Sequence, residues 1–426
     1  MSSAMPQIRA IADEAEFTQW LNAFLAGFLS AAPSTPEAVA GLWAHTDPAR
    51  VQGAFDRGHC VGTFYSFTHQ VTLPGGAPLT SNAVTDVSVA ATHRRRGLLS
   101  SMMATDLAAA RDRGDAVASL IAAEYPIYGR YGFGPATAFT TYEIDVRRTG
   151  LDPRRTGAPD CGGQIDFADG AEVREVGPAL HERFRRRQHG AVSRDSYWWQ
   201  LNTGAAPSLM LPWREAFHVL YRSRDGQVEG LATYRADDTW AESNQPRVTV
   251  TVADFVTVSA AADRALWQFL CSIDWVARVR TNALAPDTLL PELLPDPRAC
   301  RTVTHSDHLW LRVLDVCAAL QARTYQAQGS LVLQVRDAAG FADGRYLLST
   351  TETMPDAAQA TATCTPTRSA ADLALDVAEL GRLLLGDTSA VRLARLGRIT
   401  EERPGAAALA DRLLRTPLRP WCPDVF

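Results

Sequence analysis

Apolar residues recur along the N-terminal third of the chain with the spacings of helices and of strands. Phe17, Trp20 and Phe24 repeat at intervals of three and four, which predicts an amphipathic helix over residues 14–29. The Pro33-Ser-Thr-Pro36 segment ends this helix, and a second short helix follows it. Alternating and apolar runs then predict strands at residues 50–55, 60–72, 78–89 and 117–122.

A further helix is predicted between the last two of these strands. Leu99, Met103 and Leu107 recur at every fourth position, so that one apolar face points toward a core. After the last strand, residues 142–146 alternate again and predict one more strand of the same unit. A Gly- and Pro-rich linker follows this strand, so the first domain is expected to span residues 1–150.

The next stretch of the chain repeats this order of elements. A helix is predicted over residues 177–188, followed by a hairpin of two strands. A β-branched strand over residues 247–258 then precedes a helix over residues 265–276. A proline-rich segment ending at Pro297 marks the next boundary. We therefore expect a second domain over residues 151–297 with the topology of the first.

The last third of the chain predicts a different arrangement, in which helices lie at one end of an antiparallel sheet. This pattern is typical of an α+β layer, and the third domain is expected to span residues 298–426. The predicted strands lie at residues 307–313, 331–335, 344–350 and 359–365. The predicted helices lie at residues 316–325 and 371–385.

Composition and charge narrow the class of protein. Hydrophobic residues make up 46% and charged residues 21% of the 426 positions, as in ordinary globular domains. The net charge of −5 argues against a nucleic-acid partner, because nucleic-acid-binding domains are usually strongly basic. No apolar run reaches the ~20 residues that a membrane span requires, and no signal peptide is visible at the N-terminus. We therefore expect a cytoplasmic protein.

The cysteines and histidines give no sign of a metal site. The 7 cysteines are scattered along the chain without a Cys-x-x-Cys pair, which fits a reducing compartment. His305 and His308 form the one close histidine pair and lack a third ligand nearby, so we expect neither to bind a metal.

Three arginines and a glycine stand where the predicted helix after position 97 begins. Arg94, Arg95 and Arg96 precede Gly97, and a glycine there lets backbone N–H groups approach a phosphate closely. The helix dipole and the guanidinium groups add positive potential at the same point. The pattern therefore predicts a pyrophosphate-binding loop. It is not a Walker A motif, because the glycine spacing is wrong and the chain has no lysine, and it does not read G-x-G-x-x-G.

Two strings in this region resemble known acetyltransferase motifs. Arg94-x-x-Gly97 resembles the acetyl-CoA loop of the GNAT acetyltransferases, and Tyr128-x-x-x-Gly132-Phe133 resembles their aromatic turn. The longer strings THRRRGLL and IYGRYGFGPAT, found in that order, resemble the Eis (enhanced intracellular survival) N-acetyltransferases of actinobacteria. The resemblance implies a mixed α+β fold with tandem GNAT-like acetyltransferase domains followed by a sterol-carrier-like domain.

The Eis resemblance also implies a function. It implies acetyl-CoA-dependent transfer to amines of polycationic small molecules such as aminoglycosides, at more than one amine, by a homohexamer. In the second domain AAADRALW stands in place of HRRRGLL, without a glycine, so we expect that domain to bind no CoA and to be structural. One alternative is acetylation of protein lysines or peptide amines. Another is a lipid-binding or scaffold protein with a dead acetyltransferase, which the intact loop and Tyr128 disfavour.

Acetyl transfer needs groups that hold the thioester and polarise its carbonyl. The strand over residues 87–89 can hold the pantetheine arm by strand-like hydrogen bonds, and a free N–H there can polarise the carbonyl. Residues 95–100 stand where the pyrophosphate is expected, and Ala123 and Glu124 match family positions that contact the cofactor. The predicted cofactor-binding residues are Val87, Ser88, Val89, Arg95, Arg96, Gly97, Leu98, Leu99, Ser100, Ala123 and Glu124.

Tyr128 is the predicted general acid. A tyrosine pKa of about 10 keeps the hydroxyl protonated at neutral pH, ready to donate to the leaving thiolate. Tyr125 and Tyr131 compete for this role, and the spacing to Gly132 favours Tyr128. For the base, the resemblance implies the C-terminal α-carboxylate, here that of Phe426. The apolar residues of the last segment favour docking of this tail over fraying.

The acceptor side is predicted from fewer residues. The resemblance implies that Phe28 and Trp43 wall the acceptor cleft. Asp86 and Asp424 are further acidic groups that could bind a polycation, although solvation at the surface is the expected role of each.

Overall fold

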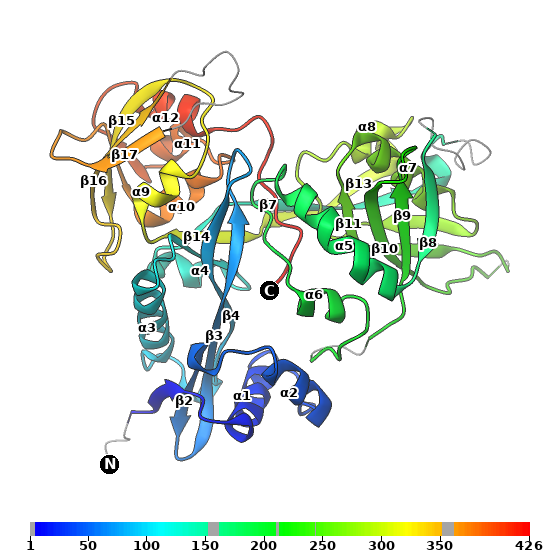
Figure 1. Ribbon diagram of the computed structural model, residues 1–426, viewed down its shortest axis with the longest axis horizontal. Coiled ribbons are helices and arrows are strands. Elements are labelled where there is room, and N and C mark those ends of the chain that lie inside the picture. The colour runs from blue at the N-terminus through cyan, green and yellow to red at the C-terminus, as the bar shows by residue number, and fades with distance from the viewer. Residues whose placement is uncertain (1–4, 152–161, 210–212, 243, 352–361) are drawn as a thin grey trace.

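The computed structural model describes residues 5–151, 162–209, 213–242, 244–351 and 362–426. Within these ranges the chain forms three lobes, each built around one β-sheet (Figure 1). Two of the sheets have seven strands and the third has five. None of the helices in the described ranges is long and apolar enough to cross a membrane.

The first lobe is a sheet in the order β1-β2-β3-β4-β5-β14-β6. α1 and α3 lie on opposite sides of β3 and β4 (Figure 1). The strands are β1 (Gln7–Ala10), β2 (Val51–Asp56), β3 (His59–Thr72), β4 (Pro78–Val89), β5 (Val117–Ile121), β6 (Gly134–Pro135) and β14 (Leu309–Val313). The helices are α1 (Glu14–Gly27), α2 (Pro36–Trp43), α3 (Leu98–Asp112) and α4 (Tyr125–Tyr128). The strands predicted from residue 50 to residue 122 are thereby confirmed, whereas β1 was not predicted.

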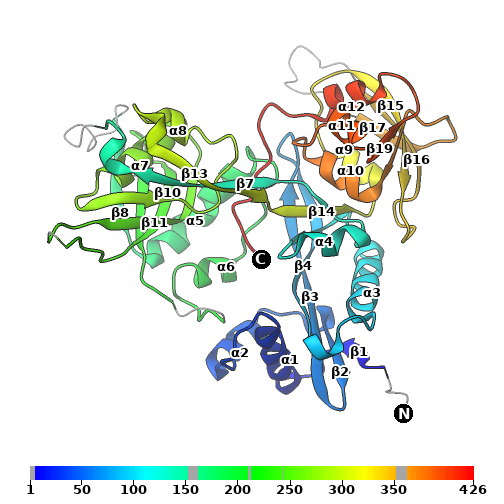
Figure 2. The ribbon, with the colours of Figure 1, turned by 180° about the vertical axis from the view of Figure 1, so that it is seen from behind.

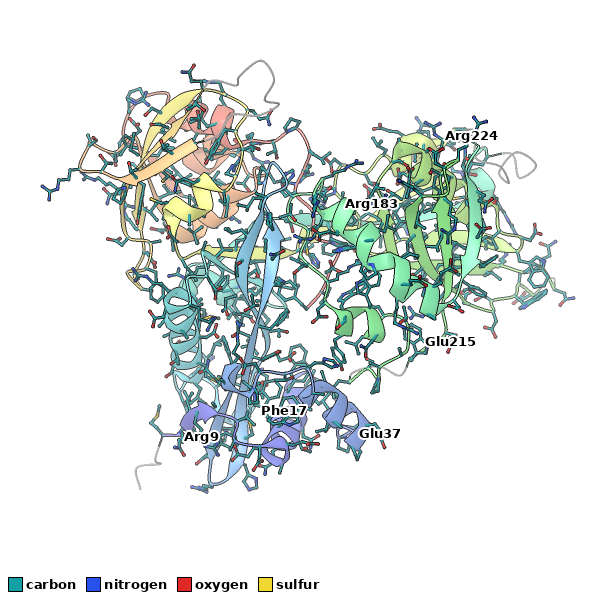
Figure 3. The ribbon with its side chains drawn as sticks, in the orientation of Figure 1. Arg9, Phe17, Glu37, Arg183, Glu215 and Arg224 are labelled. Carbon is teal, nitrogen blue, oxygen red and sulfur yellow. The ribbon has the colours of Figure 1, made fainter. Side chains whose placement is uncertain are left out.

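α1 forms because its first turn is capped and one of its faces is apolar. The Asp13 side chain accepts a hydrogen bond from the Glu16 backbone N–H, and acidic residues in the first turn complement the helix dipole. Phe17, labelled in Figure 3, is 3% exposed and stacks on Trp20 with ring centroids 5.7 Å apart. This face packs against β3, so the end of α1 is held close to β4.

The second lobe is a sheet in the order β13-β7-β12-β11-β10-β9-β8. Its strands are β7 (Ala138–Asp145), β8 (Gln164–Ala168), β9 (Phe217–Arg222), β10 (Val228–Ala236), β11 (Val248–Thr257), β12 (Val276–Arg280) and β13 (Cys300–Asp307). Its helices are α5 (Gly170–Arg185), α6 (Ser196–Leu201), α7 (Ala260–Ser272) and α8 (Leu290–Leu293). The predicted helices therefore exist but begin earlier than expected, because Asp169 and Ser259 cap them.

The third lobe is a sheet in the order β17-β16-β15-β18-β19, covered by helices. The strands are β15 (Gly329–Arg336), β16 (Gly344–Thr350), β17 (Ala362–Pro366), β18 (Leu373–Asp376) and β19 (Ile399–Glu401). The helices are α9 (Val316–Gln321), α10 (Val377–Leu384), α11 (Ala390–Arg395) and α12 (Ala406–Leu414). Residues 359–361 of the predicted strand 359–365 lie outside the described residues.

The helix predicted over residues 371–385 is wrong at its start. Residues 373–376 form β18, which pairs in parallel with β15, and α10 begins at Val377. Leu373 and Leu375 are 0% and 1% exposed, so two apolar strand positions run directly into the apolar period of the helix. The apolar period of a strand cannot be distinguished from that of a helix over so short a stretch of sequence.

The first two lobes exchange strands along the chain. β7, expected as the strand 142–146 of the first sheet, instead pairs with β12 and β13 in the second sheet. β14, expected as the strand 307–313 of the third domain, pairs with β5 over its whole length and belongs to the first sheet. Figure 2 shows β7 and β14 extending from one lobe toward the other. The sheets therefore do not follow the boundaries at residues 150 and 297, which stay predictions.

Candidate active site

β4 and β5 separate at the centre of the first sheet. They pair in parallel only between Ser81–Ala83 and Val117–Ser119, and β4 continues beyond this region. The β3–β4 register shifts after Thr63, where Asp86 has a φ of +53° and its carbonyl accepts a 2.8 Å hydrogen bond from Thr63 Oγ1. This bulge leaves Val87–Val89 without a β5 partner. The free strand edge can bind an extended ligand by backbone hydrogen bonds.

The loop after β4 leaves the N-terminus of α3 open. Gly97 has a φ of +77°, and no side chain of the described residues caps the helix. A Cβ at this position would meet no atom within 4 Å. Arg95 and Arg96 are exposed, and the His93–Asp56 pair, 3.1 Å apart, ties the loop to β2. Open N–H groups, the helix dipole and exposed guanidinium groups fit a pyrophosphate.

The first turn of α3 combines a core residue with an exposed one. Leu98 is 2% exposed and packs in a small core, whereas Leu99 is only partly buried. Met103 and Leu107 are 0% and 3% exposed and belong to the core against which Leu99 packs, so the predicted stripe faces the core as expected. Ser100 is exposed, and its Oγ lies 3.0 Å from the Tyr131 hydroxyl. That contact links the loop to the aromatic turn.

The aromatic turn holds Tyr128 in a buried, protonated state. Tyr128 is 9% exposed, belongs to the core cluster against which Val87 and Val89 pack, and meets Phe133 edge to face at 6.4 Å. Burial raises its pKa to about 12, so the hydroxyl keeps its proton at neutral pH. No other described residue forms a hydrogen bond with this hydroxyl.

The two competing tyrosines are engaged elsewhere. The Tyr125 hydroxyl accepts a 2.7 Å hydrogen bond from Arg382, and its side chain is 48% exposed. Tyr131 contacts Ser100, as described above. Ala123 and Glu124 are both exposed on the segment between β5 and α4. Of the predicted cofactor residues, Val87, Val89 and Leu99 pack against the core cluster that contains Tyr128, and Ser100 contacts the aromatic turn.

The C-terminal tail docks between the first two lobes and ends on the first sheet (Figures 1 and 2). The Phe426 ring meets His69 edge to face at 4.7 Å and Phe67 at 5.9 Å, both on β3. Asp424 is 4% exposed, so the expectation that it is solvated at the surface is wrong. Its Oδ1 accepts a 2.9 Å bond from Arg194, and its carbonyl lies 3.0 Å from His308 Nε2.

Comparisons with known proteins agree with this geometry. Residues 7–136 and residues 190–313 each match a family described as an acetyltransferase (GNAT) domain, and residues 316–423 match a sterol carrier protein domain. A Streptomyces avermitilis protein, named an uncharacterized N-acetyltransferase, is 55% identical over 98% of both chains. The N-acetyltransferase Eis of Mycobacterium tuberculosis is 34% identical over 83% of both chains. The chain belongs to the Eis family of N-acetyltransferases.

Solved structures support the same fold for this Eis-family chain. Eis1 from Mycobacterium abscessus matches with a TM-score of 0.82 at 32% identity, over 99% of this chain and 100% of that chain. A GCN5-related N-acetyltransferase from Anabaena variabilis has a TM-score of 0.81 at 17% identity, with the same coverage, and shows the fold alone. The predicted tandem GNAT domains, the sterol-carrier-like domain and the acetyl-CoA-dependent N-acetyltransferase activity are therefore confirmed.

The second GNAT domain of this Eis-family chain differs from the first at its helix N-terminus. The Ser259 side chain caps α7 by accepting a hydrogen bond from Ala262 N–H, so the helix satisfies part of its own N-terminus. No glycine opens the backbone there. The open N-terminus of α3 is therefore not repeated in α7. Among the described residues, no group of three or more His, Cys, Asp or Glu side chains could hold a metal ion.

The predicted acceptor residues lie in two different environments. Phe28, 43% exposed, extends the α1 stack from Phe24, with ring centroids 4.7 Å apart. One residue before it, Gly27 faces Ser88 so closely that a Cβ would meet the serine Cβ at 2.5 Å. Phe28 thus follows the point where α1 meets the β4 bulge. Trp43 is partly buried against Phe17 at 5.1 Å, as a core contact between α1 and α2.

Several residues of this region were not predicted from the sequence. Tyr65 and Phe67 stack at 5.9 Å on β3 and connect the position opposite Thr85 with the Phe426 ring. Alternation predicted this strand but did not show which of its faces receives the tail. Arg194, which binds Asp424, stands in a connecting segment without a recognisable motif. Its 230-residue separation from Asp424 leaves no local signal.

Proposed function

We propose that the first GNAT domain transfers acetyl groups from acetyl-CoA to amines of a polycationic small molecule such as an aminoglycoside. The observation that carries this proposal is the docking of Phe426 on Phe67 and His69 of β3, opposite the Ser81–Ala83 part of β4 where its pairing with β5 ends. Tyr128 shares the core against which this β4 segment packs. The carboxylate-bearing end of the chain thus contacts β3, and the acid packs near the adjacent strand β4.

Each residue of the site then has a defined task. Acetyl-CoA supplies a thioester carbonyl that an amine can attack. The backbone of residues 87–89 binds the pantetheine arm, and one of its N–H groups polarises the carbonyl. Arg95, Arg96 and the N–H groups of residues 97–100 bind the pyrophosphate. Ala123 and Glu124 border the cofactor on the β5 side.

Two proton transfers complete the reaction. The Phe426 α-carboxylate accepts, through water, the proton that the acceptor ammonium must lose before its nitrogen attacks. As the carbon–nitrogen bond forms and the carbon–sulfur bond breaks, Tyr128 donates its hydroxyl proton to the leaving sulfur. Solvent then takes the second proton from the new amide nitrogen and returns one to the Tyr128 phenolate. The balance of protons therefore requires neither a metal nor a redox partner.

The charge of the acceptor side supports a cationic substrate. Asp86 stands at the bulge with a partly buried carboxylate, and burial raises the pKa of this group to about 6. At neutral pH it is therefore mostly ionised, and it accepts a 3.3 Å hydrogen bond from Thr85 Oγ1. Together with the Phe426 carboxylate it would attract ammonium groups. Phe28 would supply an apolar wall next to them.

The proposal is tested by the release of CoA thiol from acetyl-CoA in the presence of single acceptors. We expect release with aminoglycosides, and mass spectrometry of the product should show more than one added acetyl group. Lysine-containing peptides of matched charge form the second arm of the panel. Faster release with these peptides would favour the protein-amine alternative, and no release with any amine would favour the scaffold alternative.

The Tyr128→Phe variant tests the acid in the same assay. General acid catalysis contributes about 100-fold or more, so amine-dependent thiol release should fall by that order. Tyr125→Phe is the matched control, because this tyrosine lies in the same helix but binds Arg382. An equal loss in both variants would contradict the assignment of Tyr128.

We further propose that the protein assembles as a homohexamer, as its membership of the Eis family suggests. The edge strand β13 is exposed along Arg301–His305, and such an edge is available for contact with another chain. Light scattering should then give a mass of six times 46.3 kDa. A monomeric mass would contradict this assembly.

A further inference from the structure

Arg194 connects the second lobe to the C-terminal tail inside the protein. Its Nη1 and Nη2 each donate a 2.9 Å hydrogen bond to the carboxylate of Asp254, on β11. Its Nε donates a third, also 2.9 Å long, to Asp424 Oδ1. The Arg194 and Asp424 side chains are 1% and 3% exposed. The guanidinium also lies 3.7 Å from the centroid of the Trp198 ring.

The neighbouring residues of the tail are fixed by the same lobe. Trp421 is 6% exposed, packs edge to face on Phe184 of α5 at 5.6 Å, and donates its backbone N–H to the His189 carbonyl. Gly190 permits this approach, because a Cβ there would lie 2.9 Å from the Trp421 nitrogen. The second lobe thus holds the tail at Trp421 and Asp424, five and two residues before Phe426, which contacts β3 of the first lobe.

We propose that Arg194 and Asp424 are positioning residues, which hold the tail so that the Phe426 carboxylate reaches the active site of the first domain. This inference rests on the proposed function, in which that carboxylate is the base. It also gives the second GNAT domain a task, since its β11 carries the Asp254 that orients Arg194.

The composition of the cluster argues for positioning over simple stabilisation. A buried ion pair contributes little net stability, because desolvation offsets its Coulomb attraction, whereas its directional bonds fix geometry. The cluster also leaves some of its buried polar atoms without a hydrogen bond. Asp424 Oδ2 and His181 Nε2 are both buried without a hydrogen-bond partner among the described residues, and they lie 3.9 Å apart. Apolar packing of the tail would avoid these unpaired atoms but would not set the direction of its end.

The Asp424→Ala variant removes the carboxylate through which the tail binds Arg194. Arg194 keeps both bonds to Asp254, so no buried cation is left unpaired. We expect kcat for amine acetylation to fall about 10- to 100-fold, the loss that a small misplacement of a reacting group causes. The KM for acetyl-CoA should not change. Hydrogen exchange of the peptide 417–426, followed by mass spectrometry, should become faster.

Two further variants separate positioning from folding. Asp424→Asn keeps an oxygen for Arg194 Nε and turns an NH2 group toward His181, so it should restore kcat toward that of the native protein. Glu172→Gln is the matched control, because it removes a carboxylate from the partly exposed Arg222–Glu172 pair of the same lobe. It should leave both kcat and the exchange of the tail unchanged.

A chain extended by one glycine after Phe426 distinguishes the role of the terminal carboxylate as base from the role of Asp424 in positioning it. If Asp424 acts through the terminal carboxylate, Asp424→Ala should lower kcat no further in the extended chain, because the two changes remove the same function. Multiplied losses would overturn the positioning role, and so would native exchange of the tail in Asp424→Ala. If extension alone leaves kcat unchanged, the base of the proposed function fails, whereas faster tail exchange in Asp424→Ala would still show that Asp424 holds the tail.

Discussion

Burial sets the protonation states of the two titratable side chains that the proposed reaction uses. It raises the pKa of Tyr128 to about 12, which leaves the hydroxyl fully protonated when the thiolate departs. It also raises the pKa of Asp86 to about 6, so this carboxylate is ionised at neutral pH but not in mild acid. Sequence spacing predicted Tyr128, but it could not predict the environment of Asp86, which depends on a bulge and a φ of +53°.

A pH dependence of acceptor binding follows from Asp86. The carboxylate that attracts an ammonium is present above its pKa of about 6 and is lost as the pH falls through it. The KM for a polycationic amine should therefore rise by up to about tenfold per pH unit below this value. Asp86→Asn should remove the dependence and give a high KM at every pH.

Steady-state kinetics between pH 5 and pH 8 would measure this effect. The KM for acetyl-CoA serves as the internal control, because Asp86 belongs to the acceptor side. A KM for the amine that rises equally in the native protein and in Asp86→Asn would remove Asp86 from acceptor binding. The same raised pKa makes the ionised carboxyl slightly destabilising, so its contribution to stability falls as the pH increases from about 4 to about 6.

At the scale of elements, the cofactor site depends on backbone groups that lack a partner, on the edge of β4 where it separates from β5 and at the N-terminus of α3. The β4 bulge frees a strand edge, and Gly97 frees the N-terminus of α3. The sequence predicted β4, the loop and the helix at nearly their observed positions, because alternation, arginine clustering and period are all local signals. It did not predict the bulge, because a register shift depends on the partner strand.

Gly97→Ala tests the open helix terminus. Alanine in the left-handed conformation costs about 1–2 kcal/mol, and its Cβ would stand where a phosphate must approach. Loss of one charge-assisted hydrogen bond would raise the KM for acetyl-CoA by about tenfold or more. Gly114→Ala is the matched control, because Gly114 has a φ of +87° and equally open surroundings just past the other end of α3.

Thermal unfolding and acetyl-CoA kinetics together decide this prediction. Both glycine variants should lose similar stability, since both place a Cβ in a left-handed residue without a steric contact. Only Gly97→Ala should change the KM for acetyl-CoA. An equal KM in both variants would show that the backbone at Gly97 does not bind the pyrophosphate.

At the scale of the whole molecule, the lobes are joined by exchanged strands and by the tail. β7 and β14 each lie in a sheet other than the one expected from chain order. Hydrophobic period identifies a strand, but sheet membership is decided by partners far away in the sequence. The same limit explains Asp424, an acidic residue near the chain end that a sequence places at the surface and that the structure buries against Arg194.

The proposed reaction requires the last residue of the chain to complete the active site of the first domain. The most direct test compares kcat of amine-dependent CoA release between the native chain and the chain extended by one glycine. Extension displaces the α-carboxylate of Phe426 while leaving its ring and the rest of the tail in place. We expect kcat to fall about 100-fold, with an unchanged KM for acetyl-CoA. An unchanged kcat in the extended chain would contradict this role of the last residue.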